Sequence, residues 1–164
     1  MHNSVLRLLI LIALALPGSA SAAGIEVPDP QMRDTCPVCG MLVARYPAWI
    51  ATVLYGDGHT EHFDGAKDLF KYLFDLPRYA PDRTPDEISA IGVTEYYGLA
   101  RIDARAAWYV IGSDVLGPMG HELVPLESEV DAQEFMEDHQ GARILRFEEV
   151  TPDLIERLDA GRIR

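Results

Sequence analysis

Apolar and polar residues alternate along this chain in short segments that are typical of strands. Strand-like runs are predicted at residues 42–43, 49–55, 59–63, 92–97, 107–111, 122–126 and 144–147. Helical spacing of apolar residues and capping signals predict helices at residues 66–74, 129–139 and 152–158. The sequence Gly56-Asp57-Gly58 between two strand-like runs indicates a hairpin turn.

Residues that favour helix ends lie at the borders of these helices. Asp64 is expected to cap the first helix, Ser128 the second and Thr151 the third. Gly141 is expected to end the second helix, because glycine readily takes the left-handed conformation that follows many helices. The three prolines within residues 77–85 predict a loop.

The same order of elements occurs twice along the chain. Residues 59–74 contain a strand, an acidic cap and a helix, and residues 120–139 repeat that order. We therefore predict an α+β fold of two small ββα-type units, with antiparallel sheets and packed helices. These similar halves are expected at about residues 35–80 and 92–158, within one domain that covers residues 24–164.

The first residues have the features of a secretory signal peptide. Arg7 precedes an apolar run at residues 8–16, and Ala20-Ser21-Ala22 fits a cleavage site. The apolar run is too short to cross a bilayer as a mature helix. We therefore predict a cleavable signal peptide at residues 1–23 and export to a bacterial periplasm. No cysteine follows the run, so the attachment site of a lipoprotein is not expected.

The chain is strongly acidic, with a formal net charge of −12. Such a charge repels nucleic acid and anionic lipid surfaces, and it can attract cations or a basic partner. The sequence has no glycine-rich phosphate loop and no Ser-His-Asp arrangement. We therefore expect neither nucleic acid nor a small-molecule substrate as a partner.

The two cysteines of the chain are Cys36 and Cys39, and they are followed by Gly40 and Met41. Two thiolates and a nearby thioether form a soft ligand set, which selects Cu(I) and, less exclusively, zinc or iron–sulfur clusters. The residue after Cys39 is glycine rather than histidine, which excludes a c-type haem attachment site.

Two other uses of the cysteines remain open. A disulfide is compatible with an oxidising compartment, although bridging so short a loop adds little stability. A redox pair needs a helix N-terminus to lower a thiol pKa, and no helix is predicted directly after Cys39. Metal binding is therefore the favoured interpretation.

A second candidate segment is the glycine-rich loop at residues 112–121. Met119 lies among glycines, where packing gives it no evident role, and His121 follows two residues later. Both side chains are therefore candidates for the second half of a soft metal site. A zinc site is an alternative in which His59 and His62 join the cysteines, but residues three apart on a strand point to opposite faces.

Several motifs taken together resemble those of the NosL family. They are the cysteine motif at residues 36–41, His62-Phe63-Asp64 leading into Asp68-Leu69-Phe70, the loop Gly117-Pro118-Met119-Gly120, and the tail at residues 132–147. The resemblance extends over residues 35–150. Members of this family are copper-binding accessory proteins of nitrous oxide reductase in denitrifying bacteria, and their fold has two similar ββα-containing units.

The resemblance implies a Cu(I) site that uses Cys39 and Met119, with Cys36, Met41 and His121 as further candidates. It also implies a periplasmic metallochaperone that delivers copper to an apo-enzyme, nitrous oxide reductase, without catalytic turnover of its own. Many members are lipoproteins, whereas this chain lacks a cysteine at the cleavage site. The alternatives are a periplasmic thiol–disulfide oxidoreductase that uses the two cysteines, and a zinc-stabilised interaction domain.

Overall fold

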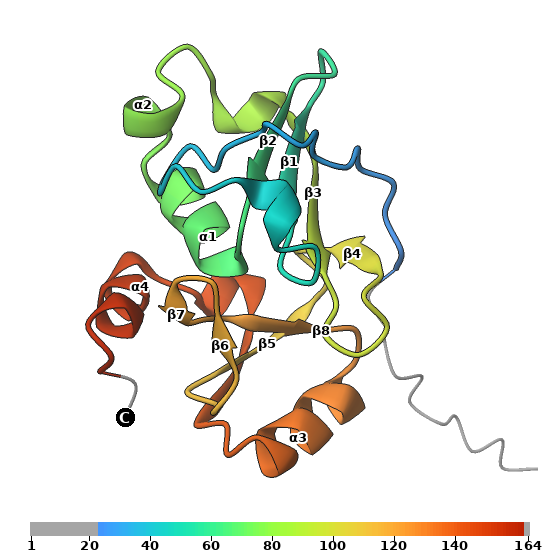
Figure 1. Cartoon of the computed structure of the whole chain (residues 1–164), viewed down its shortest axis with the longest axis vertical. Coiled ribbons are helices and arrows are strands. Elements are labelled where there is room, and N and C mark those ends of the chain that lie inside the picture. Colours follow the sequence, from blue (N-terminus) through green and yellow to red (C-terminus); the bar gives the residue numbers. More distant parts are fainter. Residues whose placement is uncertain (1–22, 163–164) are drawn as a thin grey trace, which may run out of the picture.

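Two antiparallel sheets, a small hairpin and four α-helices make up residues 23–162, the part of the chain that this computed structural model describes (Figure 1). The first sheet has the strand order β2-β1-β3-β4, with bounds β1 Ala51–Tyr55, β2 Thr60–Phe63, β3 Ile88–Thr94 and β4 Arg101–Asp103. The second sheet has the order β8-β5-β9, with bounds β5 Trp108–Ile111, β8 Val124–Leu126 and β9 Arg143–Arg146. The hairpin pairs β6 Leu116–Gly117 with β7 Gly120–His121.

The helices are α1 Ala66–Phe74, α2 Leu76–Tyr79, α3 Glu129–Asp138 and α4 Pro152–Asp159. Three short 3₁₀ helices lie at Val43–Arg45, Pro85–Glu87 and Phe147–Glu149. In Figure 1, α1 (green) lies against the first sheet, α4 (red) lies beside α1 and the β6–β7 hairpin, and α3 covers the far face of the second sheet. None of the described helices is long and apolar enough to cross a membrane.

One hydrophobic core joins the two sheets. Phe70 of α1 meets Tyr109 of β5 edge-on, with ring centroids 5.5 Å apart, and both side chains are buried. Successive residues of a strand face opposite ways, so Val110 of β5 packs instead with Phe135 of α3 in a second, smaller core. Both faces of the second sheet are therefore buried, one in the core shared with α1 and the other against α3.

The predicted α+β class with antiparallel sheets and packed helices is confirmed. Helix α1 has the predicted bounds, and Ser128 and Thr151 cap α3 and α4 through their side-chain oxygens. Strand β3 hydrogen-bonds to β1 and therefore belongs to the first sheet. The chain passes from the first sheet to the second after β4. The division of residues 24–164 into two similar halves stays a prediction, and the predicted signal peptide lies outside the described residues except for Ala23.

Local predictions failed where short-range signals were weak. Residues 42–43 form an isolated bridge and the start of a 3₁₀ helix rather than a strand. Strand β4 was missed because it is only three residues long, and α2 was missed because its proline lies in the first turn, where proline is tolerated.

Two helix ends also differ from the prediction. Gly65 is the N-cap of α1, and the side chain of Asp64 turns toward a cysteine instead. After α3, the positive φ of 55° belongs to Gln140 and not to Gly141. Gly141 has a different role, because a Cβ atom there would lie only 2.6 Å from Val110 Cγ1.

This close approach predicts that Gly141→Ala destabilises the protein by about 1 to 3 kcal/mol, through overpacking between α3 and the second sheet. Gly56→Ala is the matched control, since its Cβ would make an ordinary contact, at 3.7 Å from the Glu87 carbonyl oxygen. The control should change stability by less than about 1 kcal/mol. Urea unfolding of both variants measures the difference, and equal midpoints would contradict the packing argument.

Candidate metal centre

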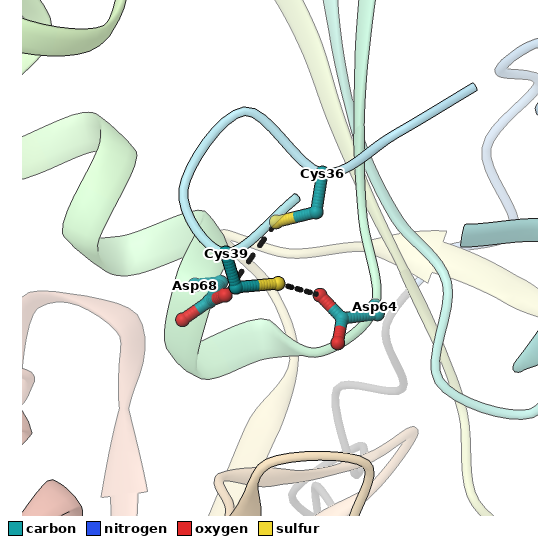
Figure 2. A group of neighbouring side chains, drawn as sticks. All are labelled: Cys36, Cys39, Asp64 and Asp68. Atoms are coloured by element: carbon teal, nitrogen blue, oxygen red, sulfur yellow. Dashed lines mark hydrogen bonds between the residues drawn. The ribbon is translucent and has the colours of Figure 1, made fainter. Parts of the chain in front are cut away.

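Two thiols and two carboxylates converge beside the start of α1. One ligand atom from each side chain lies within 4.8 Å of those of the others, in a group that we call the thiol–carboxylate cluster: Cys36, Cys39, Asp64 and Asp68. Figure 2 shows the four side chains pointing toward one another, with the cysteines on a loop and the aspartates at the end of β2 and in α1. The cluster therefore brings together segments that lie 25 to 32 residues apart along the chain.

The cysteine loop is closed by its own backbone. Cys36 N donates to Met41 O at 2.8 Å, and Gly40 N donates to Cys36 O at 2.8 Å. Gly40 takes a φ of 78°, a left-handed conformation that a residue with a Cβ adopts at a cost. A further hydrogen bond from Val43 N to Asp34 O ties off the base of the loop at 3.0 Å. This closed turn directs both sulfur atoms to the same side.

The start of α1 supplies the carboxylates. Asp64 directly follows β2, and Asp68 lies in the first turn of α1, four residues later. Asp64 precedes the N-cap Gly65 and lies just outside the helix, and both carboxylates face the cysteine loop, with which they form hydrogen bonds. Asp64 is 1% exposed and Asp68 is 2% exposed. Carboxylates are rarely buried so deeply without a partner, which indicates a specific use for them.

Each thiol has its own carboxylate partner. Cys39 Sγ donates to Asp64 Oδ1 at 3.1 Å, and Cys36 Sγ donates to Asp68 Oδ2 at 3.5 Å (Figure 2). Asp68 Oδ1 lies 3.1 Å from the ammonium of Lys71. Asp64 Oδ2 is buried and has no hydrogen-bond partner among the described residues. An unsatisfied buried carboxylate oxygen is costly, and a cation bound in the cluster would offset that cost.

The surroundings keep both thiols protonated in the absence of a metal. Burial raises the pKa of the Cys36 thiol to about 12, although backbone N–H groups of the loop lower it in part. Burial also raises the pKa of the Cys39 thiol, and its hydrogen bond to Asp64 raises it further. A redox-active cysteine pair shows the opposite behaviour, with one thiol pKa lowered by a helix N-terminus or a cation.

The other predicted ligands lie on two neighbouring loops. Met41 closes the cysteine turn and is half-buried. Met119 lies in the turn between β6 and β7, with 47% of its surface exposed, and its carbonyl oxygen accepts a hydrogen bond from Lys67 Nζ at 3.0 Å. His121 lies in β7 and is half-buried. Since Lys67 directly precedes Asp68, the Met119 turn is anchored at the end of α1 that carries the cluster.

The structure brings Cys36 and Cys39 together as predicted, but the sequence analysis did not select the two aspartates as ligands. It assigned Asp64 to a helix cap and used Asp68 only in the family resemblance. Their spacing of four residues at the start of a predicted helix was the available signal. Coordination by Met119, Met41 and His121 stays a prediction.

The two histidines weighed for a zinc site lie outside the cluster. His59 is exposed and pairs with Glu61, with 2.9 Å between Nε2 and Oε1. His62 is buried, and its Nδ1 lies 2.9 Å from Thr52 Oγ1 on the neighbouring strand. Burial lowers the pKa of His62, which favours the neutral ring. These contacts give both rings a structural role, that of His62 within the first sheet and that of His59 in the turn before β2.

Comparison with known proteins shows which family this chain resembles. The model of the NosL family matches residues 28–155. A copper-binding lipoprotein NosL of Stutzerimonas stutzeri is 28% identical over 136 residues, which are 75% of this chain and 65% of that protein. The crystal structure of the copper chaperone NosL from Shewanella denitrificans superposes with a TM-score of 0.64 and 26% identity, over 78% of this chain and 97% of that one.

The matched family region contains the cysteine loop, both aspartates and the Met119 hairpin. The match to the solved structure covers most of this chain, so the likeness concerns the whole fold and is not confined to a short motif. A family model that matches this much of the sequence, together with the shared fold, shows that this chain belongs to the NosL family.

Proposed function

We propose that this protein is a periplasmic Cu(I)-binding metallochaperone that delivers copper to an apo-enzyme, with nitrous oxide reductase as the client. The observation that carries the proposal is the thiol–carboxylate cluster, in which two sulfur atoms lie close together and a buried carboxylate oxygen lacks a hydrogen-bond partner among the described residues. The names of the relatives, a copper-binding lipoprotein and a copper chaperone, support copper as the cargo.

The proposed ligands are Cys39, Cys36 and Met119, with Met41 and His121 as further candidates. Thiolates and a neutral thioether suit Cu(I), because soft ligands favour soft metals. Asp64 and Asp68 each hold one thiol proton in the metal-free protein. When a thiol binds metal its proton must leave, and the adjacent carboxylate is placed to accept it first and pass it on to solvent.

A carrier must also release its cargo. Cys36 is only 1% exposed, whereas Cys39 is partly exposed and Met119 is about half exposed. The inner thiol can therefore hold the metal while a partner's ligand approaches from the side of Cys39 and Met119. This exchange of ligands involves no catalytic turnover.

Zinc binding is the second candidate, and the two carboxylates favour it. Zinc accepts thiolates and carboxylates together in tetrahedral sites, and the cluster offers two of each. Thiol–disulfide exchange has less support, because both thiol pKa values are raised and no α-helix begins at Cys39.

Metal competition tests the proposal. The chain from residue 24 onward, purified without oxygen, is titrated with Cu(I) against a chelator of known affinity, with zinc present at equal concentration. We expect one Cu(I) per chain, bound more tightly than zinc, because sulfur is the preferred partner of Cu(I). Displacement of copper by equimolar zinc would instead identify the cluster as a zinc site.

The thioether ligand is tested by Met119→Leu. This change conserves volume and should alter stability by less than about 1.5 kcal/mol. Cu(I) affinity should still fall by at least about tenfold, because leucine has no lone pair and even outer-shell changes at metal sites cost that much. Cys39→Ser should cost more, since it removes a thiolate. Met136→Leu is the matched control in the second core and should bind as the parent does.

The number of thiolate ligands is tested by pH. Both thiols have raised pKa values in the metal-free protein, so each one that ligates Cu(I) must release a proton near neutrality. Cu(I) affinity should therefore fall as pH drops from 8 to 6, by about tenfold per pH unit for each thiolate. The slope for Cys39→Ser should be half that of the parent. A flat profile would remove the cysteines from the ligand set.

A further inference from the structure

The carboxylate of Glu122 is buried between the β6–β7 hairpin and α1. Glu122 directly follows β7 and is only 4% exposed. Its Oε1 accepts a hydrogen bond from Lys67 N at 2.6 Å and another from Leu123 N at 2.9 Å. A side chain that follows the hairpin therefore binds the backbone of a helix that lies 55 residues earlier in the chain.

This contact completes the start of α1. The first N–H groups of a helix lack partners within the helix, and they attract negative charge. The N-cap residue of α1 is Gly65, which has no side chain to fill this role. Glu122 supplies the missing acceptor to the backbone N–H of Lys67, the second residue of the helix. Lys67 lies between Asp64 and Asp68 in sequence.

Lys67 makes a second connection from the same point of α1. Its side chain is almost fully buried, and Nζ donates to Met119 O at 3.0 Å. Nζ also lies 3.1 Å from Asp159 Oδ1 at the end of α4. The backbone N–H of Lys67 thus binds the residue after the hairpin, while its ammonium binds the turn of the hairpin that presents the Met119 side chain.

Two glycines make room for Glu122. A Cβ atom at Gly65 would lie 2.3 Å from Glu122 Oε2, and one at Gly117 would lie 3.1 Å from Glu122 Cγ. The backbone of Gly65 is extended, with a φ of −179°, so its conformation alone does not require glycine. The space taken by the carboxylate is therefore the reason that the structure gives for glycine at this position.

We propose that Glu122 is a positioning residue that, together with Lys67, docks the β6–β7 hairpin onto the start of α1 and so sets where the Met119 thioether lies relative to the thiol–carboxylate cluster. This inference rests on the proposed function, because it assigns Glu122 an effect on metal binding through Met119. Burial of a carboxylate is costly, and it raises the pKa of Glu122 to about 8. Because hydrogen bonds are directional, the buried carboxylate of Glu122 gives the docking a fixed geometry, which an apolar contact would not provide.

The first test needs no metal. Hydrogen exchange of the amides in β6, β7 and the first turn of α1 is compared between the parent and Glu122→Ala. Exchange at Lys67 and in the hairpin should rise by about tenfold or more, because Lys67 N loses its acceptor and the hairpin loses its connection to α1. Glu149→Ala is the matched control, since Glu149 also accepts a backbone hydrogen bond, from Arg146 N at 2.7 Å, but it is exposed. Unchanged exchange in Glu122→Ala would overturn the docking role.

The second test links the docking to Met119. Cu(I) affinity is measured for Glu122→Ala, Met119→Leu and the double variant. If Glu122 acts through Met119, each single change lowers the affinity and the double variant binds within about twofold of Met119→Leu alone. Glu122→Gln keeps an acceptor oxygen and should restore the parent affinity. Losses that multiply in the double variant, or a Glu122→Gln variant as weak as Glu122→Ala, would overturn the proposal.

A milder variant covers the case in which Glu122→Ala does not fold. Lys67→Leu removes the hydrogen bond to Met119 O and the ion pair to Asp159 without adding a metal ligand, and it leaves the backbone N–H that binds Glu122. This variant should increase hydrogen exchange in the hairpin. It should lower Cu(I) affinity when Met119 is present but not in the Met119→Leu background. No change in either quantity would overturn the proposal. If the parent itself binds no Cu(I), the proposed function fails, and the exchange data still decide the docking.

Discussion

The contact between two thiols, one of them fully buried, and two buried carboxylates is the constraint on which the rest of the structure depends. Buried carboxylates need donors, and each thiol supplies one to its carboxylate while staying in its neutral form. The closed turn at residues 36–41 and the first turn of α1 bring them together. Packing of α1 in the larger core then fixes the carboxylates, so that core holds the cluster in place.

The start of α1 is therefore the point at which three parts of the chain meet. The cysteine loop approaches it through Asp64 and Asp68, and the β6–β7 hairpin approaches it through Lys67 and Glu122. This junction also explains why the N-cap of the helix is Gly65, which leaves room for the carboxylate of Glu122. A metal carrier built this way has a buried inner thiol and a more exposed outer side, where ligands can be exchanged with a partner.

Sequence periodicity and capping signals were sufficient for much of the fold. The helical spacing of Ala66, Leu69 and Phe70 is a local property, and so is the cap at Ser128, which explains why both predictions are confirmed. The cap of α1 was not predictable in the same way, since Glu122 reaches it only through tertiary structure. The cysteines were recognised because two soft ligands with only two residues between them are rare. The aspartates, in contrast, resemble ordinary helix-start residues until the fold places them beside sulfur.

The coordination shell itself is the most direct test of the central claim that this cluster holds a soft metal through sulfur. X-ray absorption at the copper K-edge, on the chain loaded anaerobically with one equivalent of Cu(I), counts and identifies the neighbours of the metal. The account predicts a shell dominated by sulfur, with at least two sulfur atoms supplied by the cysteines. A shell of nitrogen and oxygen alone would contradict it, because the metal would then lie away from the thiols.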